Sequence, residues 1–184
     1  MVFISDTQQS LMAAVYLVNT LPGFDDEDTL VTVADFERYL AVNPYTGAIR
    51  HDQAEVEAVR GIRSRLRELW NVDRDGAVPL VNGMLRDGEA LPRLVRHDGY
   101  DWHIHATSDD APLATRILVE AAMAFVDVIR ADEYDRVRVC SADDCNSVYI
   151  DYSKNGSKRY CDTGNCGNRM NVIAYRARKA RETV

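Results

Sequence analysis

Hydrophobic residues recur at helical spacing along most of the first 130 residues, between short polar stretches. This pattern predicts five amphipathic helices. We expect them at residues 9–20, 33–42, 53–70, 79–85 and 110–129. Thr32 stands where it can cap the second helix, and Asp52 with Glu55 forms a start for the third that resembles a capping box. The apolar faces of these helices are expected to share one core.

Two shorter segments alternate between apolar and polar residues and predict strands. Residues 93–96 and 100–106 flank Asp98-Gly99, a dipeptide that strongly favours the turn of a β-hairpin. Residues 147–152 also alternate, with Val148 and Ile150 on one side. Because residues 154–157 have the composition of a turn, we expect a second hairpin there. The polar residues 131–135 are interpreted as a linker.

All four cysteines lie in the C-terminal part of the chain, as two pairs of identical spacing. Four residues separate Cys140 from Cys145 and Cys161 from Cys166, and fifteen residues separate the pairs. Two thiolate pairs on turn-forming sequences are typical of a tetrahedral zinc site. Four thiolates would complete the coordination of one Zn²⁺ per chain, which would therefore be structural. The alternatives are two disulfides, four unrelated core cysteines, or a redox or catalytic role.

The compartment of the protein bears on the choice between zinc and disulfides. No stretch approaches the roughly 18 to 20 apolar residues of a membrane helix, and the first ten residues lack the pattern of a secretory signal. We therefore expect a cytoplasmic protein without membrane contact. Disulfides are rare in that reducing environment, which favours the metal site.

Charge is distributed unevenly along the chain. The net charge is −7, yet the segment 152–184 carries eight Lys or Arg and two acids, which gives +6 and leaves −13 for residues 1–151. Such asymmetry indicates a basic contact surface attached to an acidic body.

The segment 169–182 predicts a C-terminal helix with two different faces. We expect an apolar stripe to pack on the cysteine turns; its members are Met170, Ile173, Ala174, Ala177 and Ala180. Cations, Asn and Tyr share the rest of the surface and could contact phosphates and bases. These candidates, with three cations of the cysteine loop, are Lys154, Lys158, Arg159, Asn171, Tyr175, Arg176, Arg178 and Lys179. The alternative is a charged helix that only faces solvent.

Residues 161–169 resemble the signature of the CGNR zinc finger, and residues 138–145, 151–160 and 175–178 are similar to that family as well. The one departure is Tyr160, where the family has tryptophan. The resemblance implies that the four cysteines are zinc ligands. It also implies that Arg169 and the basic residues after it contact DNA, which adds Asn168, Arg169 and Arg181 to the candidates.

In that family the finger follows a domain called ABATE, whose members are described as stress-induced transcription regulators. Residues 10–130 resemble it, through residues 15–20 in the first helix and 92–95 in the hairpin. The predicted fold class is α+β. A mostly helical ABATE-like domain with a hairpin covers residues 1–131, and a treble-clef-like or knuckle-type zinc module ending in a basic helix covers residues 132–184.

Other polar residues of the helical domain are weaker candidates. Asn19 and Thr20 could line a small-molecule pocket, although a helix C-cap is the favoured interpretation. His103 and His105 share one side of a predicted strand, where a solvated face is more common than a metal site. The sequence contains no nucleophile elbow, phosphate-binding glycine loop or HExxH motif, so we expect no enzyme.

These features predict a regulator that binds double-stranded DNA through its zinc finger. The N-terminal domain would then sense a small-molecule effector or bind a protein partner. The alternative function is a zinc-dependent module that docks on an acidic protein without binding DNA. A metal-dependent enzyme is the third class considered.

Overall fold

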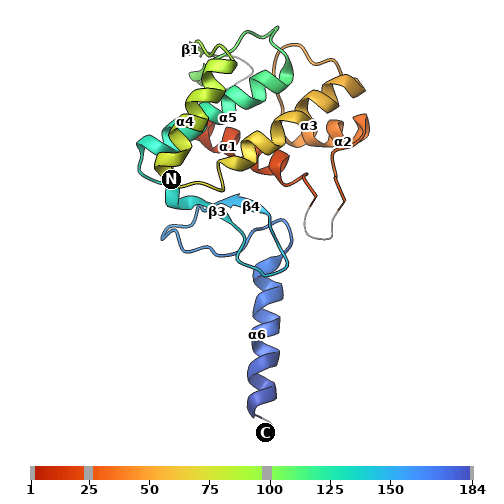
Figure 1. Cartoon of the computed structure of the whole chain (residues 1–184), viewed down its shortest axis with the longest axis vertical. Coiled ribbons are helices and arrows are strands. Elements are labelled where there is room, and N and C mark those ends of the chain that lie inside the picture. The colour runs from red at the N-terminus through yellow and green to blue at the C-terminus, as the bar shows by residue number, and fades with distance from the viewer. Residues whose placement is uncertain (1–2, 23–26, 97–100, 183–184) are drawn as a thin grey trace.

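The computed structural model describes residues 3–22, 27–96 and 101–182. Five helices form the body, and a module of short strands and one long helix follows them (Figure 1). The helices of the body are α1 (Ser5–Val18), α2 (Val33–Val42), α3 (Gln53–Glu68), α4 (Arg74–Asp87) and α5 (Leu113–Arg130). The shorter elements and the last helix are β1 (Arg93–Val95), β2 (His103–His105), the 3-10 turn Tyr134–Arg136, β3 (Val137–Val139), β4 (Val148–Ile150) and α6 (Cys166–Glu182).

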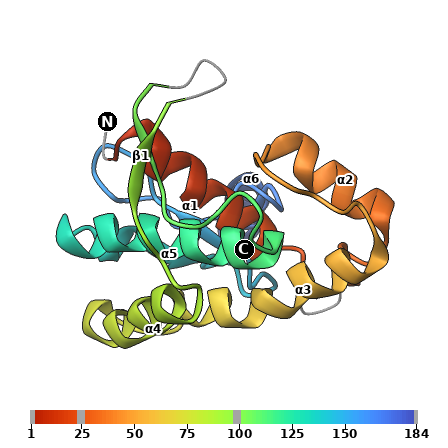
Figure 2. The ribbon, with the colours of Figure 1, turned by 90° about the horizontal axis from the view of Figure 1, so that it is seen from above.

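Helix α5 lies at the centre of the body, with α1, α3 and α4 packed around it (Figure 2). Its apolar side is continuous, and Phe125 on that side is fully buried and packs edge-to-face with Trp70, with ring centroids 5.3 Å apart. Full burial of one such aromatic side chain contributes roughly 2–3 kcal/mol. The helix predicted at residues 110–129 is thus the central element of the core.

Local capping explains where the helices begin. Thr32 and Asp35 form a capping box at α2, and the Asp52 side chain accepts from the backbone N–H of Glu55 at α3. In a capping box the Glu55 side chain would accept from the backbone N–H of Asp52, but this bond does not form. Its carboxylate accepts from the backbone N–H of Arg50 and of His51 instead of Asp52. It therefore ties the preceding turn to the helix.

The fourth helix is longer than the sequence pattern predicts. The prediction of residues 79–85 treated Pro79 as the start, but α4 begins at Arg74 because Asp73 caps it through the backbone N–H of Gly76. Proline is therefore accommodated inside the helix. The first helix also begins earlier than expected, at Ser5, since Thr7 is buried and continues its inner face.

The first hairpin is confirmed in its strands. β1 and β2 pair antiparallel, with Arg93 opposite His105 and Val95 opposite His103. The Asp98-Gly99 turn that predicted it lies outside the described residues.

The segment interpreted as a linker is instead part of the packed body. Tyr134 is buried against Phe125, and its hydroxyl donates to the carbonyl of Leu69 at 2.5 Å. The following strand β3 pairs antiparallel with β4 across the first cysteine turn, with Val137 opposite Ile150. The prediction of a hairpin around residues 154–157 was therefore wrong. The alternating pattern identified β4 correctly but could not identify its partner strand.

Strand β4 joins the module to the body because its two faces belong to different cores. Val148 and Ile150 pack into the main core, whereas Tyr149 packs with the cysteines. The Asn19 amide binds both backbone groups of Val148, accepting from its N–H at 2.8 Å and donating to its carbonyl at 2.9 Å. Trp70 Nε1 donates to the carbonyl of Tyr149 at 3.2 Å.

Helix α6 projects away from the rest of the molecule (Figure 1). Met170 is partly buried against the cysteines, but residues 171–181 are exposed. The prediction that the whole apolar stripe packs on the cysteine turns was therefore wrong, because Ile173, Ala174, Ala177 and Ala180 are exposed to solvent. Helical periodicity identifies the stripe, but it cannot show that the turns are too small to reach beyond the first helical turn. In the described part of the chain, no helix has the length and apolar character needed to span a membrane.

Candidate metal centre and basic helix

The first cysteine pair sits on a turn at the end of the β3–β4 hairpin. The turn is closed by the backbone N–H of Cys145, which donates to the carbonyl of Ala142 at 3.0 Å. The backbone N–H of Cys140 donates to the carbonyl of Ser147 at 2.9 Å, which anchors the turn to the strands. These backbone bonds fix the positions of both cysteines, and their sulfurs lie close together.

The second pair lies on a turn that leads directly into α6. Asn165 adopts a positive φ of 50°, a conformation that asparagine tolerates better than most residues. A Cβ atom at Gly164 would lie 3.0 Å from Cys166 Sγ, so the glycine keeps this turn close to the sulfur. Cys166 is the first residue of α6, where the helix dipole favours a thiolate.

The four sulfurs fit a zinc ion in number and spacing. All lie within 4.8 Å of one another, and Cys161 Sγ is 3.7 Å from the sulfurs of Cys145 and Cys166. Tetrahedral Zn–S bonds of about 2.3 Å place sulfurs about 3.8 Å apart. A disulfide needs about 2.05 Å, and all four cysteines are free. The site thus has the geometry of one structural zinc ion and leaves no position for a water ligand.

The chemistry of the sulfurs also calls for a cation. Burial raises the pKa of Cys166 to about 12 and also raises that of Cys161. Burial raises the pKa of Cys145 as well, but hydrogen bonds with Ser147 and the other sulfurs outweigh it and place the pKa at about 7. Four thiolates in this space would repel one another strongly without a divalent cation. The backbone N–H of Cys161 lies 3.4 Å from Cys140 Sγ and would stabilise that thiolate.

Arg169 belongs to the metal centre. Its Nη2 donates to Cys166 Sγ at 3.1 Å, and its Nη1 pairs with the carboxylate of Asp144 on the first turn. Zn²⁺ with four thiolates carries a net charge of −2, which the guanidinium partly offsets. The resemblance assigned Arg169 to DNA; the structure places its guanidinium between the two cysteine turns.

We expect Arg169→Ala to weaken zinc binding by about 10-fold to 100-fold, the range found when groups supporting metal ligands are removed. Competition of the zinc-loaded chain with a chromophoric chelator measures this affinity. Arg178→Ala, on the exposed part of the same helix, is the matched control. Equal zinc affinity in both variants would show that Arg169 does not support the centre.

Asp151 organises the loop between the two pairs, and sequence reasoning missed it. This fully buried carboxylate accepts from the backbone N–H of Ser153 and of Lys158, both at 2.8 Å. Arg138 adds a bond from its guanidinium to the carbonyl of Lys158 at 3.0 Å. Nothing in an aspartate at the end of a strand distinguishes such a role from surface exposure.

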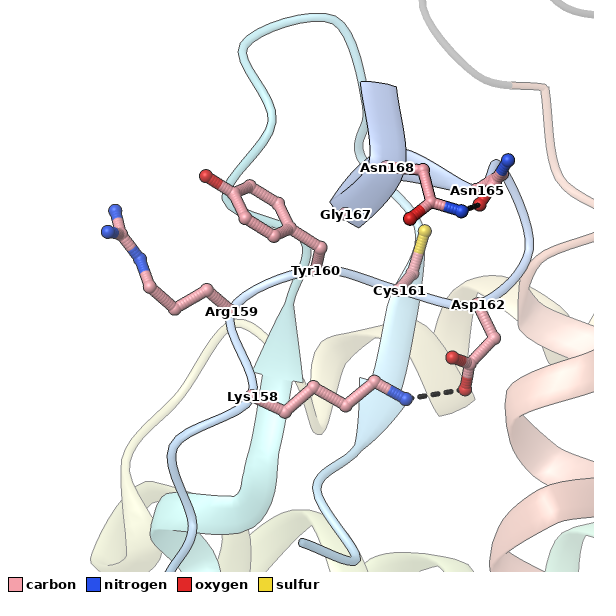
Figure 3. A pocket seen from close by; sticks show the side chains of 8 residues that line it. All are labelled: Lys158, Arg159, Tyr160, Cys161, Asp162, Asn165, Gly167 and Asn168. Atoms are coloured by element: carbon pink, nitrogen blue, oxygen red, sulfur yellow. Dashed lines mark hydrogen bonds and ion pairs between the residues drawn. The ribbon is translucent and has the colours of Figure 1, made fainter. Parts of the chain in front are cut away.

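The other predicted DNA contacts fall into two groups. Lys158, Arg159 and Asn168 line a hollow of about 320 Å³ beside the start of α6 (Figure 3). Lys158 pairs there with Asp162, whereas Arg159 extends away from the loop. The side chain of Asn168 donates to Asn165. Lys154 is exposed outside this hollow. The second group lies on the exposed part of α6 and contains Asn171, Tyr175, Arg176, Arg178, Lys179 and Arg181.

Asn19 and Thr20 hold the structure of the body together. Asn19 is the C-cap of α1 and binds Val148, while the Thr20 hydroxyl donates to the carbonyl of Leu17 and accepts from Arg63. Their groups are thus directed at the chain itself, and the ligand pocket suggested for them stays a prediction. His103 and His105 face each other with Nε2 atoms 3.2 Å apart. Within the described residues, the cysteines form the one cluster of three or more metal-binding side chains.

Two family models match the chain, one after the other. ABATE, described as "Putative stress-induced transcription regulator", matches residues 12–132, and the CGNR zinc finger matches residues 136–179. No curated protein matches the chain. Both descriptions agree with the order of body and module seen in the structure, and neither names an enzyme.

Proposed function

Since the chain belongs to the ABATE family and ends in a CGNR zinc finger, we propose that it is a transcription regulator that binds double-stranded DNA through α6. The helical body, residues 1–131, would act as a domain that senses a ligand or binds a partner. The zinc module, residues 132–184, would present the helix. The protein would act in the cytoplasm without catalysing a reaction.

The observation that carries this proposal is the exposure of α6. From Asn171 to Arg181 every residue is exposed, and the helix points away from the body (Figure 1). An α-helix is about 10–12 Å wide, which matches the major groove of B-DNA at about 12 Å. No other helix of the described chain is open on all its sides in this way.

Charge supports the same orientation. The body is strongly acidic and would be repelled by phosphates, whereas α6 carries Arg176, Arg178, Lys179 and Arg181 beyond the metal centre. Arg159 extends from the loop beside the first turn of α6, where helix N–H groups also favour anions. DNA would therefore approach the end of the molecule that is remote from the body.

The test is a titration of the zinc-loaded chain with a duplex of mixed sequence at several salt concentrations. If four to six phosphates are contacted, the logarithm of the affinity should fall with the logarithm of salt with a slope of about −4 to −5. The double variant Arg176→Ala with Arg178→Ala should reduce the size of the slope by about 2 and weaken binding to all sequences.

The matched control is Arg86→Ala with Arg130→Ala, which removes the same charge from exposed positions on the body. Its salt slope should equal that of the unmodified chain. Absence of duplex retardation at low ionic strength would overturn the proposed DNA binding.

One observation favours the alternative function. Beyond Met170 the apolar stripe of α6 is exposed, with Ile173 52% exposed, and the neighbouring Val172 is 47% exposed. A helix with apolar and cationic faces is also suited to docking on an acidic protein. That function predicts loss of a protein complex when Ile173 is replaced by serine, with no retention of duplex at low salt by the unmodified chain.

A further inference from the structure

The helical body contains a cavity that no predicted function has used. It lies between the N-terminal half of α1, the loop after α2, the strand β2 and the middle of α5, and has a volume of about 680 Å³. Figure 2 looks down on this region, where the β1–β2 hairpin passes in front of α1 and α5. Sites for small molecules typically enclose about 300–1,000 Å³.

Much of the wall is apolar, and it includes one exposed and one less exposed aromatic side chain. Trp102 and Ile104 of the hairpin line it while staying 63% and 41% exposed, so they form its rim. Tyr45 and Met123 also line the cavity and are less exposed, and the Tyr45 hydroxyl is 3.2 Å from that of Tyr39. An exposed indole over a cavity is a group that can stack on a ligand or face a cation.

The charged groups of the wall have one sign. Four carboxylates line the cavity, from Asp6, Asp101, Glu120 and Asp127, while its described lining contains no Lys or Arg. Asp127 accepts the hydroxyl of Thr7 at 2.6 Å, which fixes its orientation. The field inside should therefore favour positive charge, and it acts in a partly desolvated space where charges interact more strongly than in water.

Two histidines add little positive charge. His103 and His105 both line the cavity, and their Nε2 atoms are 3.2 Å apart. A hydrogen bond between these nitrogens requires one of the two to be deprotonated. The pair can therefore offset at most one of the four carboxylates while that bond persists.

Glu120 is the carboxylate best placed to bind a ligand. Arg116, on the same helix, donates to the carbonyls of Thr46, Ala48 and Ala111, and its charge acts on Glu120 without a hydrogen bond between them. Among the described residues no hydrogen bond or ion pair of the Glu120 carboxylate is found. Burial raises its pKa to about 7 although the charge of Arg116 lowers it, so a further positive neighbour would favour its charged form.

We propose that this cavity binds an amphipathic organic cation, with its charge beside Glu120 and its apolar body against Trp102 and Met123. The inference gives a ligand class to the sensing role proposed above, and it depends on that role only for its regulatory meaning. Binding is measured without DNA, so failure of either proposal leaves the other testable.

The test uses two probes of nearly equal shape and opposite charge, tetraphenylphosphonium and tetraphenylborate, with the full zinc-loaded chain in a calorimeter. The cation should bind one per chain, and the borate should bind at least about tenfold more weakly because carboxylates repel it. In buffers of different ionisation enthalpy, cation binding at pH 7 should release part of a proton as Glu120 becomes fully charged.

Two variants locate the binding. Glu120→Gln should weaken the cation at least about tenfold and abolish the proton release, whereas Asp75→Asn, an exposed acid on α4, should change neither. Trp102→Ala removes an exposed side chain, should therefore fold, and should weaken the cation as well. Equal binding of the two ions, no binding of the cation, or unchanged cation affinity in both cavity variants would overturn the proposal.

Discussion

Replacing Cys161 by alanine should eliminate zinc from the chain and unfold the C-terminal module while the helices of the body persist. The module has few other sources of stability, since its own core consists of five buried residues, three of them ligands. In small modules of this kind, zinc contributes about 10–16 kcal/mol of apparent binding free energy, which is also folding free energy. Elemental analysis should find close to one zinc per unmodified chain and almost none in the variant.

The control for this experiment is Asp143→Ala, an exposed side chain on the first cysteine turn. It should retain one zinc and the thermal stability of the unmodified chain. A Cys161→Ala variant that kept a full equivalent of zinc would refute the four-sulfur site, and so would an unmodified chain that folds fully without metal.

Asn19→Ala should destabilise the zinc-loaded chain by about 2–6 kcal/mol and loosen the module from the body. The change leaves the N–H and the carbonyl of Val148 without their partner in a residue that is fully buried, and each such group costs about 1–3 kcal/mol. Denaturant unfolding measures the loss. Trp70 bonds to the adjacent Tyr149, so its fluorescence should report the loosening directly.

Two further variants test whether the loss comes from the bonds to Val148 and not from replacing any asparagine. Asn71 lies in the exposed turn between α3 and α4, so Asn71→Ala should change stability by less than about 0.5 kcal/mol. Asn19→Asp keeps an acceptor for the N–H of Val148 but sets a carboxylate against its carbonyl, so it should also be destabilising. If Asn19→Ala were as stable as the unmodified chain, the hydrogen bonds between Asn19 of the α1 C-cap and Val148 of β4 would not hold the module to the body.

Features that depend on local pattern could be predicted from the sequence. The long run of apolar residues in α5, the Thr32 cap and the equal spacing of the cysteine pairs each have a local physical signature, and the structure confirms all three.

Features that depend on partners distant in the chain were missed. Nothing near Asn19 indicates that its amide binds Val148, which is 129 residues away. The alternation around β4 is equally compatible with a partner strand before or after it. The uncovered stripe of α6 has the same origin, because periodicity reveals an apolar face but not whether another element reaches it.

Cys166 is both a zinc ligand and the first residue of α6, which ties the rotational phase of the whole helix to the ion. Each residue along an α-helix advances by about 100° around the axis. The angular position of every distal cation is therefore set relative to Cys166 and the ion. An insertion of one residue after Met170 would swing the distal cations round the axis by about that angle. An insertion of seven residues, close to two whole turns, would lengthen α6 by about 10 Å and nearly restore the angular position of these cations.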